Sequence, residues 1–139
     1  MKTLKIKTLE KGWCDKDNVM LHAVMQLVVD FIEKERPDEH IDWTWDSGHE
    51  KAWATITDVY DWWTERRKKR HNPADDLELR DDWITFGEPD ENGNVPATLN
   101  NTPEETEIIL AGARLESEWY HEDTEMMQRI VSVREYMWT

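Results

Sequence analysis

The stretch NVMLHAVMQLVVDFIEKE, residues 18–35, decides the fold. Between residues 19 and 32 only His22, Gln26 and Asp30 are polar. A helix that is apolar on nearly all of its sides must be covered on several of them. The three polar residues are spaced by four, so they lie in one stripe along the helix. We therefore expect this helix to be central and buried.

The composition fits one domain, residues 1–139, with a core rich in tryptophan. Only 38% of the residues are hydrophobic, but nine are Trp, and each Trp buries a large area. The chain has 31 acidic and 17 basic residues, a formal net charge of −14. Because such a surface repels phosphate, we expect no direct binding of nucleic acid.

The location of the protein is predicted from cysteine use and hydropathy. Cys14 is the single cysteine, which excludes a disulfide framework and fits a reducing compartment. The first residues contain no apolar segment typical of a signal peptide, and no run approaches the length of about 18 apolar residues that spans a membrane. We expect a cytosolic protein that does not enter a membrane.

Alternating apolar and polar residues predict two short strands, at residues 2–9 and 40–46, and residues 83–86 have the composition of a third. Residues 71–101 are otherwise irregular, with three prolines and several acidic residues. Asn92 and Gly93 predict a tight turn there.

A second helix is predicted for residues 47–69, with Ser47 as its N-cap and an amphipathic apolar face. It ends in RRKKR, residues 66–70. The helix dipole favours cations at this end, and we interpret the run as a solvated helix end in preference to a phosphate contact.

A third, long helix begins with a strong start signal: Thr102 as N-cap, Pro103 at the first position and Glu105 at the third. It contains no further proline and is predicted to reach Trp138, a length of about 55 Å, unless it kinks near Gly112. Apolar residues near its end predict a homodimer or higher oligomer. These residues are Met126, Met127, Ile130, Val131, Met137 and Trp138.

The predicted fold class is therefore α+β and mostly helical, with three main helices and two or three short strands. The first helix is expected to be central and the last to be long. The side chains expected to pack against the first helix are Trp53, Ile56, Trp63, Leu115 and Trp119.

One constellation suggests metal chemistry, because carboxylates and imidazoles that face each other across a helical bundle hold divalent ions. The candidate ligands of Mg²⁺ or Mn²⁺ are His22, Asp30, Glu33, Glu118, His121 and Glu122. With so many acidic residues, however, such spacings arise by chance. A core histidine at position 22 and an Arg or His partner for Glu122 are the simpler interpretations.

Three stretches resemble small uncharacterised acidic proteins of tailed bacteriophages. They are GWCDKDN at residues 12–18, the first helix at residues 21–23 and 27–35, and REYMWT at residues 134–139. This resemblance implies a viral product made in the cytoplasm of a bacterial host. It implies no activity and no cofactor.

The sequence favours a non-enzymatic protein that binds other proteins, because no catalytic motif is present and the negative charge suits a basic partner. The candidate partner-binding residues are Asp75, Asp76, Asp81 and Asp82. Inhibition of a host nucleic-acid-binding or defence protein, or assembly with another phage protein, would use this charge. The alternative is a Mg²⁺- or Mn²⁺-dependent nucleotide phosphohydrolase built on the six candidate ligands.

Overall fold

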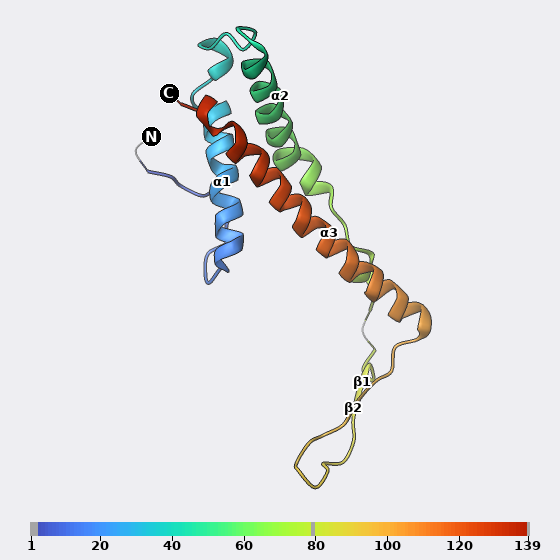
Figure 1. Ribbon diagram of the computed structural model, residues 1–139. Helices are drawn as coiled ribbons and strands as arrows, with labels where there is room; N and C mark the ends of the chain where they lie inside the picture. The colour runs from blue at the N-terminus through green and yellow to red at the C-terminus, as the bar shows by residue number, and fades with distance from the viewer. Residues whose placement is uncertain (1–2, 79, 139) are drawn as a thin grey trace. The chain divides into compact units, whose positions relative to one another are not determined.

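A computed structural model describes residues 3–78 and 80–138. These residues form three α-helices and one two-stranded antiparallel sheet, which confirms the mostly helical α+β fold class (Figure 1). The elements are α1 (Lys16–Glu33), α2 (Ser47–Asp61), β1 (Ile84–Phe86), β2 (Ala97–Leu99) and α3 (Pro103–Val133).

The chain divides into two compact units. We call Met1–Arg70 with Tyr120–Thr139 the core unit, and His71–Trp119 the acidic unit. The core unit holds α1, α2 and the C-terminal part of α3, and the acidic unit holds the hairpin and the N-terminal part of α3. The predicted organisation as a single domain stays a prediction.

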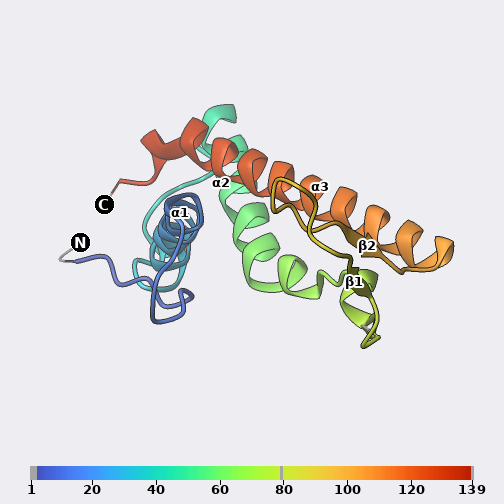
Figure 2. The ribbon, with the colours of Figure 1, turned by 90° about the horizontal axis from the view of Figure 1, so that it is seen from below.

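The core unit is built from three helices that share one hydrophobic core. Its buried apolar residues come from α1, the segment after it, the α2 segment and α3. Figures 1 and 2 show the backbones of α1, α2 and the end of α3 gathered in this unit. They are Leu21, Met25, Val28, Phe31, Trp43, Ala52, Ile56, Val59, Trp62, Trp63 and Ile130. The expected packing by Ile56 and Trp63 is confirmed, and Trp53 packs against this core partly buried. Leu115 and Trp119 belong to the acidic unit, and their packing against α1 stays a prediction.

Helix α1 is not clearly central, contrary to the prediction. One side of it is buried, with Met25 and Val28 fully covered, but Met20 is 61% exposed and Leu27 remains partly exposed. The sequence overestimates burial here because α1 is apolar on more sides than α2 and α3 cover. Val24, Leu27 and Phe31 of α1 line a groove that is described below.

The second helical segment has the predicted extent but not a regular geometry. Asp46, and not Ser47, is the N-cap, and its Oδ1 accepts a hydrogen bond from the His49 backbone N–H at 2.8 Å. After α2 the chain continues as a π-helical turn, Trp62–Arg66, and a 3-10 turn, Arg67–Lys69. π-Helical turns are uncommon and frequently lie at functional sites.

Two predicted strands are absent from the described residues. Over residues 3–9 the chain is irregular and is held to α1, because the Lys7 backbone N–H donates to Gln26 Oε1 at 3.1 Å. Over residues 40–46 the Asp42 side chain accepts from Thr44 and forms a local turn. Alternation alone does not make a strand when no neighbouring strand offers backbone hydrogen bonds.

The third predicted strand is confirmed as β1, which pairs with a strand that was not predicted, β2. The turn at Asn92 and Gly93 is also confirmed. Gly93 has a φ of +81°, and its N–H donates to Asp90 O at 3.1 Å. A left-handed conformation of this kind favours glycine.

Helix α3 begins as predicted. Thr102 Oγ1 accepts from the Glu105 N–H at 3.1 Å, while the Thr102 N–H donates to Glu105 Oε1 at 3.3 Å, which is a capping box. The helix passes through Gly112 without interruption and ends at Val133. A 3-10 turn, Arg134–Tyr136, follows it, so the helix stops before the predicted Trp138.

Candidate protein-binding surface

The acidic unit carries most of the net charge of the chain. It contains 13 acidic and 2 basic residues, a net charge of −11 out of −14, whereas the core unit contains 18 acidic and 15 basic residues, a net charge of −3. Charges of one sign gathered in one unit produce a field that attracts a basic partner before contact.

All four carboxylates that were predicted to bind a partner lie in the acidic unit and are exposed: Asp75, Asp76, Asp81 and Asp82. Asp76 Oδ2 lies 2.7 Å from His71 Nε2. This hydrogen bond, and next the negative charge of Asp76, raise the pKa of His71 above its ordinary value. The four side chains are thus accessible to a partner.

The first two of these aspartates are positioned by a 3-10 turn, Pro73–Asp76, that is anchored to α3. The anchor is the buried side chain of Asn72, whose Nδ2 donates to Gly112 O and to Glu116 Oε1, both at 3.2 Å. A Cβ atom on Gly112 would lie 2.6 Å from Asn72 Oδ1. Gly112 therefore does not kink the helix but allows the turn to approach it closely.

The hairpin of β1 and β2 presents an apolar face. Ile84 pairs with Leu99 and Phe86 with Ala97, so these four side chains lie on one face, and Phe86 and Leu99 are 64% and 63% exposed. A lone two-stranded hairpin is only marginally stable in water, so a partner that covers this face would stabilise both strands. The sequence prediction missed this face because β2 was assigned to an irregular segment, although residues 97–99 alternate.

Apolar side chains also line a groove of about 440 Å³ along α3 within the acidic unit. Pro73, Ile108 and Leu115 are among its apolar lining residues, and Arg114 and Glu118 add one charge of each sign. The acidic unit thus combines exposed carboxylates with apolar side chains at its surface, a combination that is typical of protein-binding surfaces.

The six candidate metal ligands do not form a metal site in the described structure. Glu118 belongs to the acidic unit and the other five belong to the core unit. Within residues 3–78 and 80–138, no group of three or more His, Cys, Asp or Glu side chains is close enough to hold a metal ion. The metal-dependent hydrolase alternative gains no support from this geometry.

Two of the candidate ligands on α1 are held by neighbouring side chains. Asp30 Oδ1 accepts from Gln26 Nε2 and lies next to Lys34 Nζ, both at 2.9 Å. Burial alone would raise the pKa of Asp30, but the hydrogen bonds from Lys34 and Gln26 outweigh it and lower that pKa. Glu33 Oε1 accepts from the Tyr60 hydroxyl at 2.8 Å. Both carboxylates thus have structural partners.

The two candidate histidines are also in contact with side chains. His22 Nδ1 lies 2.6 Å from Thr8 Oγ1, and the His22 ring meets Trp63 edge-on with 5.0 Å between centroids. This geometry agrees with the interpretation of His22 as a core histidine whose polar atom is satisfied. His121 contacts the ring of Tyr120, with 6.4 Å between centroids.

The run at residues 66–70 is a solvated helix end only in part: Arg66, Lys68 and Lys69 are exposed, whereas Arg67 and Arg70 pair with α3. Arg67 donates to both carboxylate oxygens of Asp123, at 3.1 and 3.2 Å. Arg70 Nη2 lies 2.7 Å from Glu122 Oε1 and 2.8 Å from Asp123 Oδ1. The expected arginine partner of Glu122 is confirmed, although Glu122 is partly exposed. These ion pairs join the end of the α2 segment to α3.

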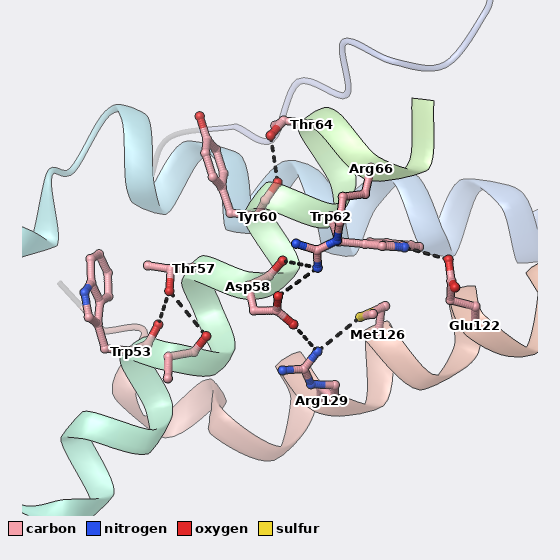
Figure 3. A network of polar contacts seen from close by, with 11 residues as sticks. Trp53, Thr57, Asp58, Tyr60, Trp62, Thr64, Arg66, Glu122, Met126 and Arg129 are labelled. Carbon is pink, nitrogen blue, oxygen red and sulfur yellow. Dashed lines mark hydrogen bonds and ion pairs between the residues drawn. The ribbon is translucent and has the colours of Figure 1, made fainter. Parts of the chain in front are cut away.

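Further along the same helices, Asp58 forms a second link that the sequence did not predict. Arg129 Nη1 donates to Asp58 Oδ2 at 2.6 Å, and Arg66 Nη2 donates to Asp58 Oδ1 at 2.7 Å (Figure 3). Trp62 Nε1 donates to Glu122 Oε1 at 2.7 Å in the same network. Polar contacts thus fix α2 against α3 along the edge of the core.

This network predicts a loss of stability in acid. The hydrogen bond from Arg129 is the main cause that lowers the pKa of Asp58, and hydrogen bonds from Arg70 and Trp62 outweigh burial to lower the pKa of Glu122. A carboxylate whose pKa is lower in the folded state stabilises the fold above its unfolded pKa of about 4, and this stability is lost as the pH falls through the folded value.

We therefore expect the urea midpoint of the core unit to fall between about pH 5 and pH 3, and to fall less in Asp58→Asn than in the natural protein. Asp61→Asn is the control, because Asp61 is an exposed carboxylate of the same helix. Equal acid sensitivity of the natural protein and Asp58→Asn would show that Asp58 contributes nothing to this linkage.

No protein-family model, curated protein or solved structure matches this chain. Among the described residues no helix has the length and apolar character needed to cross a membrane. The function is therefore inferred from the charge and surface chemistry of the two units.

Proposed function

We propose that this protein acts by binding another protein through its acidic unit. The observation that carries the proposal is the concentration of a net charge of −11 in residues His71–Trp119, together with the exposed apolar face of the hairpin. Charge alone would give weak, unselective attraction. An adjoining apolar surface supplies the short-range contacts that make such an encounter specific.

The chemistry of the surface favours a basic partner. Exposed aspartates that are fixed by the Pro73–Asp76 turn and followed by Asp81 and Asp82 resemble, in charge, the phosphates of a nucleic acid. We propose that the partner is a nucleic-acid-binding or defence protein in the cytoplasm of a bacterial host, which the protein inhibits. Assembly with another phage protein would use the same surface and is the second form of the proposal.

Capture from bacterial lysate tests the proposal. The immobilised protein should retain one or more basic proteins at about 0.05 M salt and release them at about 1 M, where the Debye length falls to about 3 Å. Mass spectrometry identifies the retained proteins. The absence of any specific protein at low salt, or retention that does not respond to salt, would contradict the proposal.

The core unit supports a further prediction of self-association. A groove of about 850 Å³ lies between α1 and the end of α3, and its apolar lining includes Leu27, Phe31, Val131 and Trp138. Trp138 is 73% exposed beside it. A two-fold axis would place Trp138 of each copy in the groove of the other. The core unit has a net charge of only −3, so repulsion between two core units is modest.

We expect a dimer mass by analytical ultracentrifugation at micromolar concentration. The double variant Leu27→Gln/Trp138→Ser should be monomeric, because each large side chain that becomes buried contributes about 1.5–3 kcal/mol. Trp45→Ser is the matched control, since Trp45 is 76% exposed but does not line the groove. A monomer mass for the natural protein would contradict this prediction.

A further inference from the structure

The core unit contains a second pocket with a different chemistry. Its volume is about 310 Å³, and it is lined by the segment before α1, by α1 itself and by the end of the α2 segment. Volumes of this order hold small molecules. Its polar lining residues include Lys7, Thr8, His22, Glu33, Arg67 and Lys68. We call this the cationic pocket.

Positive charge dominates the cationic pocket although the chain is acidic. Lys7, Arg67 and Lys68 face a single carboxylate, Glu33, which accepts a hydrogen bond from Tyr60. Arg67 is paired with Asp123. Lys7 and Lys68, in contrast, have no ion pair with any residue in the described ranges, 3–78 and 80–138. Two exposed ammonium groups therefore remain at one pocket, although the charge of Lys7 also acts on Asp30 and helps to lower the pKa of that carboxyl.

His22 adds a fixed hydrogen-bonding group to this pocket. Its ring is held by Thr8 at Nδ1 and by the edge of Trp63. Burial, and next the positive charge of Arg67, lower the pKa of His22, so the ring is neutral at pH 7. The negative charge of Asp123 acts on the pKa of His22 in the opposite direction and is the smaller effect. The Nε2 atom remains for a hydrogen bond with a ligand.

We propose that the cationic pocket binds a phosphate group carried by a small molecule. Two ammonium groups suit a dianion, and the imidazole and the Thr8 hydroxyl supply hydrogen-bonding groups beside them. Arg67 lines the same pocket while it holds Asp123. The pocket is larger than one phosphate ion, and Val29 and Trp63 provide an apolar wall for an organic substituent. The RRKKR run, residues 66–70, therefore has two roles. Its arginines join helices, and Lys68 lines the cationic pocket.

Ligand binding is measured by NMR, from the chemical shifts of the His22 imidazole. The probes are inorganic phosphate and ribose 5-phosphate, compared with chloride at equal ionic strength. Saturable shifts of the His22 signals are expected with both phosphate probes. A bound dianion stabilises the imidazolium, so the pKa of His22 should also rise. Tighter binding of the ester identifies a phosphorylated small molecule as the ligand, and equal binding identifies the free ion.

The double variant Lys7→Gln/Lys68→Gln should bind either probe about tenfold more weakly or worse, since hydrogen bonds to charged groups are lost. The control is Lys16→Gln/Lys51→Gln, which removes the same charge from exposed positions of the core unit outside the pocket. Circular dichroism confirms that both variants are folded. The proposal is overturned if neither probe shifts His22 beyond chloride, if the two double variants weaken binding equally, or if a short polyglutamate peptide binds while phosphate does not.

Discussion

Replacing Val28 by aspartate is expected to abolish the cooperative unfolding transition of the core unit. Val28 is fully buried in α1, at the centre of the cluster shared with α2. A carboxylate there has no partner and costs about 3 kcal/mol or more, a large part of the total stability of about 5–15 kcal/mol of a typical domain.

The measurement is urea unfolding followed by far-UV circular dichroism. Met20→Asp is the matched control, because it introduces the same charge on the same helix at an exposed position. We expect it to unfold close to the natural midpoint. A cooperative transition for Val28→Asp at the natural midpoint would mean that α1 does not contribute to the core as described.

A second large loss of stability is expected for Asp123→Asn. Removing this negative charge should destabilise the core unit by about 3 kcal/mol. Asp123 is mostly buried and receives Arg67 through two hydrogen bonds and Arg70 through one ion pair. Both guanidiniums also lie over the Trp62 ring, at 6.0 and 5.5 Å. Without the carboxylate, Arg67 loses both of these hydrogen bonds, and Arg70 keeps its ion pair with Glu122.

Glu125→Gln controls for the loss of a negative charge on the same helix, because Glu125 is exposed and has no ion pair within the described residues. Its urea midpoint should stay close to that of the natural protein. If Asp123→Asn is no less stable than Glu125→Gln, the ion pairs at the end of the α2 segment do not stabilise the fold.

The helices could be predicted from the sequence because their signals are local. Apolar spacing locates α1 and α2, and Thr102, Pro103 and Glu105 mark the start of α3 to the residue. The ends are less predictable, because they depend on contacts with distant residues. After α2 the helical segment widens into a π-helical turn, where Trp62 and Trp63 are both buried.

The strands show the limit of local patterns. Residues 3–9 and 40–46 alternate as strands do, yet no strand lies next to them in the described structure. Residues 97–99 form a strand because β1 pairs with them, and pairing is a property of two segments. The prediction that α1 is central was wrong for a related reason. The apolar spacing of a helix does not show which of its faces the rest of the chain covers.

The features of the candidate surface could be predicted in part. Charge counting located the exposed aspartates from Asp75 to Asp82, because an acidic run is usually exposed. The apolar hairpin face and the pairing of Arg67 with Asp123 were missed. Both depend on residues brought together across more than ten positions of sequence, and no spacing rule for helices or turns covers such distances.

Binding through the acidic unit is tested most directly by the affinity of the captured partner for two variants of equal net charge. One variant replaces Asp75, Asp76, Asp81 and Asp82 by Asn. The other replaces four exposed carboxylates of the core unit by Gln: Glu10, Glu65, Glu125 and Glu135. At low salt we expect the first variant to bind about tenfold more weakly than the natural protein and the second to bind nearly as tightly. Equal affinities of the two variants would contradict binding through the acidic unit.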